Sequence, residues 1–543
     1  MIVGGGLVGL AASVFLARQG VHALLVDRHP GVSIHGKARG INPRTMEIYR
    51  SIGLAEAITA AGKPFEGEAG VARCVSLADE WEWLYSDAAP RGMPEVTAGE
   101  ACMTDQNAVE PILLAAGRDH GARYLPNTEL VSVESTADGV LAQVADRATG
   151  ARTEIGADYL IAADGHRSPI RERLGIGRPG AHTFMHTMNI VFTAELADLL
   201  PKRALFWLIN DPATGFGAGF VSTAQADRWQ LSVRYDPEIE TERDFDEARC
   251  RKLVGTALGR ADIAVEIEGV AAWEQGVGVA ETYRRERVFL AGDSAHVWPP
   301  AQGMGANTGV QDAHNLAWKL AAVVNGWAGP ALLDTYQDER LPIAKALAPL
   351  IVRNQQARLS GGAEPTDGPD SEALIFGQHY WSSAVIEPAG RQVFATNRET
   401  VATPGARAPH LWLRRNDRRL GLHDLISDAF VLLTGAGGAA ESAGTAWCAA
   451  ATEPRTELAM PLHAYRIVEK AGDGRPEDLL DLDGQWPARY GLGADGAVLI
   501  RPDGYVAARF EPGTGNPADA LRAALRRILR ADGASSGGPG RCP

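Results

Sequence analysis

The sequence has few cysteines, no long apolar run and no excess of basic residues. Its five cysteines, Cys74, Cys102, Cys250, Cys448 and Cys542, are scattered, and none belongs to a Cys-x-x-Cys pair or to a Cys/His cluster at metal-ligand spacing. This pattern predicts reduced, mostly structural thiols and no metal site. No segment approaches the roughly 18 consecutive apolar residues that a membrane-spanning helix needs, so we expect no membrane partner.

Charge and the start of the sequence exclude further classes. There are 53 Lys and Arg against 67 Asp and Glu, a net charge of −14, and such a chain repels nucleic acid and anionic lipid. We therefore expect no nucleic acid partner. The opening MIVGGGLVGL lacks the basic head and the apolar core of a secretory signal, which predicts a cytoplasmic protein. Only Ile2 and Val3 precede the glycines, which suggests that a few residues are missing upstream.

The first glycine-rich loop predicts a dinucleotide site. A short strand, Gly4-x-Gly6-x-x-Gly9 and an apolar helical stretch lead to a second strand that ends at Asp27. In such a βαβ unit the first glycine allows a tight turn, the second leaves room for a pyrophosphate and the third lets helix and strand approach. Asp27 would then accept hydrogen bonds from ribose hydroxyls. A second loop, GAGGAA at 435–440, lacks the acidic strand end, and we interpret it as an ordinary turn.

A basic loop follows this unit. KARGINPRTMEIYRSIGL, at 37–54, places Lys37, Arg39 and Arg44 on a loop that leads into an amphipathic helix. These cations would either neutralise a pyrophosphate or form a solvated surface. For Arg44, beside a proline at an expected helix start, both interpretations stay open.

Two later segments favour a flavin over a nicotinamide nucleotide. GADYLIAADGHRSPIRERLGI, at 156–176, places Asp164 and Gly165 between an apolar strand and a helix, in a string longer than a turn requires. ERVFLAGDSAH likewise ends a strand just before Asp293, which is then placed to bind a polyol hydroxyl.

The residues after Asp293 predict a cradle for a flat ring. Pro299-Pro300 stiffen the connection, and Gly303 and Gly305 let the backbone lie close to a ring. A helix from about Asn307 onward would point its N-terminal amides at that ring, where they favour the negative charge of a reduced flavin. A nicotinamide dehydrogenase needs no such second cradle.

Together the motifs resemble those of FAD-dependent aromatic hydroxylases, the single-component class A flavoprotein monooxygenases related to p-hydroxybenzoate hydroxylase. GGGLVG at 4–9, ADGHRSPIR at 163–171 and GDSAHVWPPAQGMGANTGVQDAHNLAWKL at 292–320 occur in the family's order and at roughly its spacing. Within the family the chain is most similar to actinobacterial hydroxylases of polycyclic aromatic polyketides, the anthracycline and angucycline tailoring enzymes. The resemblance spans nearly the full chain.

The resemblance implies FAD as cofactor, with NAD(P)H and O2 as co-substrates, and hydroxylation of a bulky polycyclic aromatic substrate through a flavin hydroperoxide. One alternative keeps the cofactor but has it carry out Baeyer–Villiger insertion or ring opening on a related polyketide. Another is a flavin- or ligand-binding protein without turnover. In each case we expect a monomer or a homodimer.

The resemblance also implies which residues contact the cofactor. Asp27 and Arg28 would face the adenosine ribose, and Asp164 with Gly165 would also meet NAD(P)H. The full set of cofactor contacts is Gly4, Gly6, Gly9, Asp27, Arg28, Arg39, Gln106, Asp164, Gly165, Asp293, Gly303, Gly305, Ala306 and Asn307. Two positions depart from the family pattern, with Lys37 for the usual arginine and Ala301-Gln302 for the common Thr-Gly.

Aromatic and neighbouring residues are candidates for substrate contact, and no catalytic side chain is assigned. For the three candidates in strand-like stretches, packing in the core of a sheet is the favoured alternative. The substrate candidates are Trp207, Phe216, Phe220, Trp298, Pro300 and Gln302. We expect His296 to hydrogen-bond locally rather than act as a base, because the flavin itself supplies the oxygen.

At 543 residues the chain is long enough for several domains, and its fold class is predicted to be α/β. The resemblance implies a Rossmann-like FAD-binding domain of the GR2 type, an inserted antiparallel sheet for the substrate and a C-terminal thioredoxin-like domain without Cys-x-x-Cys. The expected ranges are 1–70, 100–180 and 277–395 for the FAD-binding domain, 71–99 and 181–276 for the sheet, 403–533 for the thioredoxin-like domain and 534–543 for a disordered tail. Pro502-Asp503-Gly504 predicts a hairpin turn.

Overall fold

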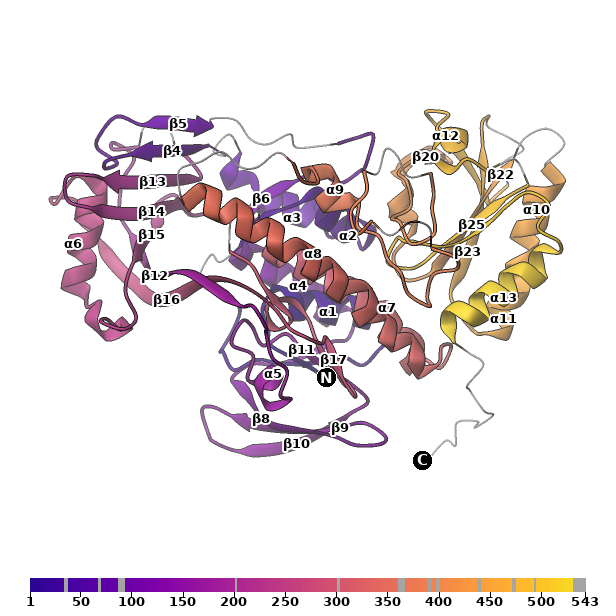
Figure 1. Cartoon of the computed structure of the whole chain (residues 1–543), viewed down its shortest axis with the longest axis horizontal. Coiled ribbons are helices and arrows are strands. Elements are labelled where there is room, and N and C mark those ends of the chain that lie inside the picture. The colour runs from indigo at the N-terminus through magenta and orange to yellow at the C-terminus, as the bar shows by residue number, and fades with distance from the viewer. Residues whose placement is uncertain are drawn as a thin grey trace.

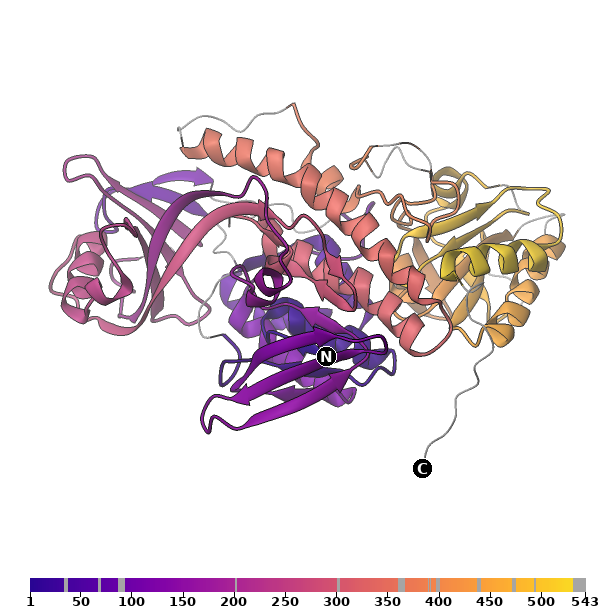
Figure 2. The same ribbon diagram turned by 60° about the horizontal axis from the view of Figure 1, so that its bottom comes forward.

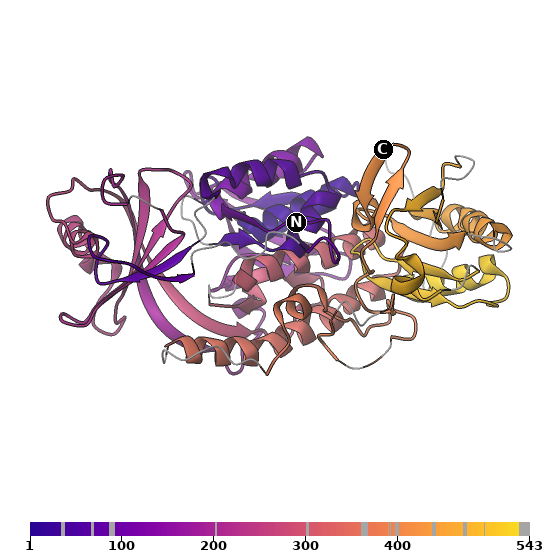
Figure 3. The same cartoon turned by 90° about the horizontal axis from the view of Figure 1, so that it is seen from above.

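The fold consists of three bodies in a row, with an N-terminal α/β domain in the middle (Figures 1 and 3). The computed structural model describes residues 1–33, 38–66, 70–85, 93–200, 203–299, 303–359, 367–388, 390, 392–396, 401–436, 441–470, 475–492 and 495–530. Pro300 and Gln302 lie outside this set, as do Lys37, Ala301 and the expected tail at 534–543. None of the helices within the described ranges is long and apolar enough to cross a membrane.

The N-terminal domain is built on a six-stranded sheet in the order β17-β18-β11-β1-β2-β7. Its strands are β1 (Ile2–Val3), β2 (Leu24–Val26), β7 (Arg123–Leu125), β11 (Leu160–Ala162), β17 (Arg284–Arg285) and β18 (Val288–Leu290). All pairs are parallel except β17 with β18. A parallel sheet is covered on both faces, which explains why every residue of β11 and β18 is apolar and buried.

Helices surround this sheet and smaller strands complete the domain. The helices are α1 (Leu7–Arg18), α2 (Pro43–Ser51), α3 (Ala55–Ala61), α4 (Gln106–Asp119), α5 (Pro169–Arg173), α7 (Met304–Val324), α8 (Asp334–Leu359) and α9 (Ser371–Phe376). Two small sheets are formed by β3 (Arg39–Ile41) with β6 (Cys102–Asp105), and by β8 (Thr128–Ser135), β9 (Val140–Asp146) and β10 (Arg152–Ala157). Figure 2 brings the three-stranded sheet forward, below the rest of the domain.

The second body is an eight-stranded sheet in the order β19-β16-β12-β15-β14-β13-β4-β5. Its elements are β4 (Val71–Cys74), β5 (Glu82–Tyr85), β12 (His182–Thr193), β13 (Phe206–Asp211), β14 (Phe216–Ser222), β15 (Arg228–Arg234), β16 (Glu266–Val279), β19 (His296–Val297) and α6 (Glu247–Leu258). The sheet is not fully antiparallel as predicted, because β13 and β4 run parallel. The chain leaves this sheet after β5 and returns to it at β12, far along the sequence. No short hairpin therefore links β4 to β13, and β13 can pair with β4 in either direction.

The last strand of this sheet comes from a segment expected in the FAD-binding domain. β16 continues to Val279 and pairs with β19, so His296 and Val297 extend the eight-stranded sheet. Between β18 and β19 the polypeptide thus passes from the six-stranded to the eight-stranded sheet within the segment at 292–320. The expected domain boundaries stay a prediction.

The third body is a mixed seven-stranded sheet in the order β21-β20-β24-β23-β22-β25-β26. Its elements are β20 (Trp412–Arg415), β21 (Arg418–Gly421), β22 (Phe430–Ala436), β23 (Leu462–Val468), β24 (Asp478–Asp481), β25 (Ala497–Ile500), β26 (Val506–Phe510), α10 (Glu441–Ala450), α11 (Thr452–Glu457), α12 (Trp486–Tyr490) and α13 (Pro517–Leu529). The predicted hairpin is confirmed, because β25 and β26 pair antiparallel across Pro502-Asp503-Gly504.

The C-terminal domain shares a hydrophobic core with the N-terminal domain. Trp318 on α7 packs edge-on against Phe430 on β22, with ring centroids 5.7 Å apart, and Trp327 and Leu332 join the same cluster. The α/β class is confirmed, whereas the similarity of the C-terminal domain to thioredoxin stays a prediction.

Candidate cofactor site

Three predicted segments meet at one edge of the six-stranded sheet. β1, β11 and β18 are adjacent parallel strands, so their carboxyl ends lie side by side. The Gly4–Gly9 loop follows β1, Asp164 follows β11 and Asp293 follows β18. Ligands of open parallel sheets bind at this edge. The fold therefore brings together the segments that carry the family resemblance.

The three glycines of the first loop have different surroundings. Gly4 has φ of +107°, and a Cβ there would overlap with the carbonyl oxygen of Ala163. A Cβ on Gly9 would overlap with the Gly4 carbonyl oxygen, so this glycine is needed where α1 meets the strand. The nearest atom to a Cβ on Gly6 would be a Glu110 carboxylate oxygen, 3.9 Å away. Gly6 therefore borders open space at the N-terminus of α1, where helix amides attract anions.

Asp27 is tied to this loop at the end of β2. Its carboxylate accepts hydrogen bonds from the backbone N–H of Gly5 and, at 2.6 Å, from that of His29. A carboxylate has lone pairs beyond these two bonds, which leaves capacity for ribose hydroxyls. Arg28 is exposed beside it, and its carbonyl accepts from Arg147 at 3.0 Å.

Gln106 begins α4 and contacts a residue that is not among the predicted cofactor contacts. Its side-chain amide donates to Glu110 at 2.6 Å, and the backbone N–H of Ser33 donates to the other oxygen of the same carboxylate at 2.8 Å. Glu110 is fully buried. Its i+4 spacing from Gln106 on a helix is a signal that would have pointed to it.

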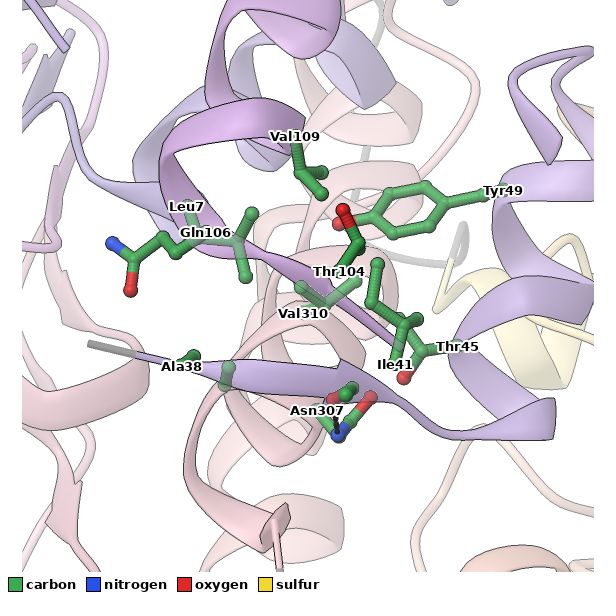
Figure 4. A pocket seen from close by; sticks show the side chains of 12 residues that line it. Leu7, Ala38, Ile41, Thr45, Tyr49, Thr104, Gln106, Val109, Asn307 and Val310 are labelled. Carbon is green, nitrogen blue, oxygen red and sulfur yellow. Dashed lines mark hydrogen bonds between the residues drawn. The ribbon is translucent and has the colours of Figure 1, made fainter. Parts of the chain in front are cut away.

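A recess opens between α2, β3, β6, α4 and the start of α7 (Figure 4). It holds about 290 Å³ of empty space, part of it open to solvent. The hydroxyls of Thr45, Tyr49 and Thr104 line it, are buried, and have no hydrogen-bond partner among the described residues. Buried hydroxyls are normally paired, so these three indicate that a polar ligand or ordered water fills the recess.

The start of α7 forms the opposite wall. The helix begins at Met304, three residues before the position predicted from sequence, and Gly303 precedes it with φ of +62°. Asn307 ties this end to the basic loop, because its amide donates to the carbonyls of Gly303 at 2.7 Å and Gly40 at 3.2 Å. Its oxygen accepts from the backbone N–H of Asn42 at 3.0 Å.

The neighbours of Asn307 also face this region. Ala306 lines the recess, and a Cβ on Gly305 would lie 4.0 Å from the Trp298 ring.

Arg39 links the cofactor region to the eight-stranded sheet. Its guanidinium pairs with Asp105 at 2.8 Å and donates to the carbonyl of Leu205 at 3.5 Å. The other oxygen of Asp105 accepts from the backbone N–H of Ala224 at 2.9 Å. The contact of Arg39 with a cofactor stays a prediction.

Arg44 serves neither of the roles left open from sequence. It is buried in α2, where it pairs with Glu47 and donates to the carbonyl of Asp503.

Asp164 and Asp293 differ in exposure. Asp164 accepts hydrogen bonds from the Ser168 hydroxyl at 2.6 Å and from the backbone N–H of Ile170 at 3.1 Å, and burial raises its pKa. Gly165 follows with φ of +85°, a conformation that favours glycine. Asp293 is exposed at the end of β18 and so remains accessible to a ligand.

His296 belongs to a buried ion-pair network. Its Nε2 lies 2.6 Å from Asp312, which also accepts from Arg340 at 2.7 Å. Burial would raise the pKa of Asp312, but the interactions with His296 and Arg340 outweigh it and hold that pKa below its ordinary value. The prediction that His296 hydrogen-bonds locally is confirmed. Trp298, a substrate candidate, stacks on the His296 ring with centroids 5.2 Å apart.

The strand aromatics lie in the core on the side of the sheet that α6 covers. Trp207 and Phe220 are fully buried, with centroids 5.7 Å apart, and Phe216 packs against the same cluster. Alternate residues of a strand face opposite sides of the sheet, and these three rings lie on the side that packs against α6. A role for them in substrate contact is therefore not supported. Core packing, the favoured alternative, describes them.

The opposite face of the sheet carries hydrogen-bonding side chains. Ser232 donates to the Asn189 side chain at 2.6 Å and accepts from Gln230 at 3.3 Å. Figures 1 and 3 show α6 on the side of the sheet away from the N-terminal domain, so this polar face lies toward the cofactor region. Neither Asn189 nor Ser232 is among the predicted site residues.

These features fit FAD. Open space beside Gly6 at a helix N-terminus suits a pyrophosphate, and the Asp27 carboxylate suits a ribose. The exposed Asp293 and the unpaired hydroxyls of the recess suit the polyol and ring of a flavin.

Comparisons with known proteins agree with this assignment. Residues 1–349 match the model of the FAD binding domain, and residues 401–531 match that of the aromatic-ring hydroxylase C-terminal domain. Tetracenomycin A2 monooxygenase-dioxygenase of Streptomyces glaucescens is 38% identical, over 99% of this chain and 98% of that protein. Aklavinone 12-hydroxylase of Streptomyces purpurascens is also 38% identical, over 97% of this chain and 98% of its own length.

A solved structure extends the similarity to the whole fold. The crystal structure of aklavinone-11 hydroxylase with FAD and aklavinone has a TM-score of 0.83 and 36% identity to this chain, and the match covers 97% of this chain and 98% of that one. The family predicted from three motifs and FAD as its cofactor are thereby confirmed. The chain belongs to the FAD-dependent aromatic-ring hydroxylases, a family of flavin monooxygenases.

Proposed function

We propose that this protein hydroxylates a bulky polycyclic aromatic polyketide with NAD(P)H and O2. One oxygen atom of O2 enters an aromatic C–H bond as a hydroxyl, the other leaves as water, and NAD(P)H gives up the two electrons. When bound, FAD supplies the redox chemistry that joins these reactants. The observation that carries the proposal is the polar sheet face opposite the cofactor recess.

That face suits a flat substrate with hydroxyl and carbonyl groups. Val191 and Val221 pair with Gln230 on the same face as Asn189 and Ser232, so this face offers both polar anchors and apolar contacts. Similar proteins support this class, because one of them was crystallised with aklavinone. The Arg39–Asp105 pair, which contacts both domains, would hold sheet and cofactor in register.

The role of the chain's own residues is to position the cofactor and the substrate and to keep water away from them. No side chain is assigned as the base that accepts a proton. We assign the pyrophosphate to the Gly4–Gly9 loop, the ribose to Asp27 and the flavin ring to the recess that Gly40 and Asn307 line. His296 remains hydrogen-bonded to Asp312 and orients the start of the 292–320 segment. A cytoplasmic location, a monomeric or homodimeric state and the predicted domain boundaries belong to the same proposal.

Anaerobic mixing of the FAD-loaded protein with NADPH or NADH tests the proposal. The flavin absorbance should bleach faster when a polycyclic polyphenol is present, and subsequent oxygen should yield a product with a new phenolic hydroxyl. A lactone carbonyl band in the infrared spectrum would instead show Baeyer–Villiger insertion. Absence of oxygen consumption with every polyphenol tested would show a binding protein without turnover.

A further inference from the structure

The turn between β25 and β26 is buried, although Pro-Asp-Gly turns are typical of exposed loops. Arg501, Asp503 and Tyr505 each expose no more than 5% of their surface. Tyr505 stacks on Tyr380 of the N-terminal domain, with centroids 4.0 Å apart. The C-terminal domain therefore inserts this turn into its neighbour.

Asp503 contacts two of the helices that begin at the cofactor recess, α2 and α7. Its backbone carbonyl accepts from the guanidinium of Arg44 on α2 at 2.7 Å, and its carboxylate accepts from Asn315 on α7 at 3.1 Å. Arg501 beside it donates to both carboxylate oxygens of Glu339 on α8, at 2.6 and 2.8 Å. A single residue of the C-terminal domain thus joins α2 to α7.

Both contacts lie a short way along stiff helices from the recess. Arg44 is two residues from Asn42, the N-cap of α2, whose N–H donates to Asn307. Asn315 is eight residues from Asn307 on α7, or about 12 Å at the helical rise. A displacement of Asp503 would therefore move α2, which carries Asn42 at its N-terminus, and α7, which carries Asn307. The hydrogen bond between these two residues would change with it.

We propose that Asp503 is a positioning residue for the flavin. By holding α2 and α7 together, it sets the separation between β3 and the start of α7, the two walls that Asn307 connects. The inference rests on FAD binding at this recess and is independent of the substrate. It gives the C-terminal domain a part in the cofactor site that it does not line.

A second joint between the same domains provides a matched control. Arg50, in the last turn of α2, pairs with Asp424 of the C-terminal domain at 2.7 and 3.0 Å. This pair is at the end of α2 that points away from Asn42, and the Arg50 side chain is 37% exposed. Asp424 also accepts from the backbone N–H of Gly421 at 2.9 Å, so its removal weakens the domain junction at that turn, while every residue that hydrogen-bonds to Asp503 keeps its side chain.

The test compares Asp503→Ala, Arg44→Lys and Asp424→Ala by titrating each FAD-free protein with FAD. Asp503→Ala and Arg44→Lys should weaken FAD binding about tenfold and shift the visible absorption of the bound flavin, whereas Asp424→Ala should do neither. Asp503→Asn, which keeps an acceptor for Asn315, should restore part of the affinity. FAD affinity and flavin absorption are measured without substrate. A negative result for Asp503 can therefore be distinguished from a failure of the proposed hydroxylase function.

The proposal is overturned if both variants keep the wild-type FAD affinity and absorption while the FAD-free proteins lose thermal stability as Asp424→Ala does. In that case the turn is only a joint between domains. Should Asp503→Ala not fold, Arg44→Lys decides alone. Lysine keeps the charge beside Glu47 but lacks the second arm that reaches the Asp503 carbonyl.

Discussion

Replacement of Gly6 by alanine separates the cofactor role of the first loop from its folding role. Gly6 has φ of −77°, which alanine adopts without strain, and its Cβ would lie 3.9 Å from the nearest atom, an ordinary contact. Since Gly6 is the N-cap of α1, we expect a loss of about 1 kcal/mol at most in the free energy of unfolding. The FAD-free variant should therefore fold.

The same methyl group occupies the open space that we assign to the pyrophosphate. We expect FAD affinity to fall at least about tenfold, or 1.4 kcal/mol. The assay is a fluorescence titration of the FAD-free protein, with circular dichroism to verify folding. Gly9→Ala should fail to fold because its Cβ overlaps with the Gly4 carbonyl, and Gly156→Ala, on the exposed edge of β10, should behave as wild type. Wild-type affinity in Gly6→Ala would refute the assignment.

Three further predictions concern the ion-pair network and the sheet face. Asp312→Asn should lower the free energy of unfolding by about 3–5 kcal/mol in thermal or urea unfolding, since it leaves the buried Arg340 without its carboxylate; an unchanged midpoint would contradict this. The folded pKa of Asp312 is depressed, so its contribution is present above the unfolded value of about 3.9 and disappears as pH falls through the folded value. Acid unfolding curves of wild type and Asp312→Asn should therefore converge at low pH. Ser232→Ala should raise KM for the polycyclic substrate by about three- to tenfold, the value of one hydrogen bond, with FAD affinity unchanged; a change in FAD affinity instead would place Ser232 outside the substrate site.

Local signals made part of the fold predictable. The glycine loop, the strand ending at Asp27 and the hairpin at Pro502-Asp503-Gly504 each depend on residues close in sequence, and the structure has all of these elements. Which face of the sheet Trp207 occupies could not be predicted in the same way. Strand alternation divides the side chains between two faces, but it does not say which face α6 covers.

Contacts between distant segments could not be predicted. Asn307 meets Gly40 across 267 residues and Asp503 meets Arg44 across 459, and neither pairing leaves a periodic or spacing signal. The unpaired hydroxyl of Tyr49 likewise becomes visible only when α2, α4 and β6 are packed together. The contact between Gln106 and Glu110 could have been predicted, since the two residues are four positions apart on a single helix.

Turnover under ¹⁸O₂ tests the central claim most directly. The FAD-loaded protein, NADPH and a polycyclic aromatic polyketide should give a product with one labelled oxygen, located in a phenolic hydroxyl, and an equal amount of oxidised NADPH. A product that takes its oxygen from labelled water, or NADPH oxidation that yields only hydrogen peroxide with every such substrate, would contradict the account.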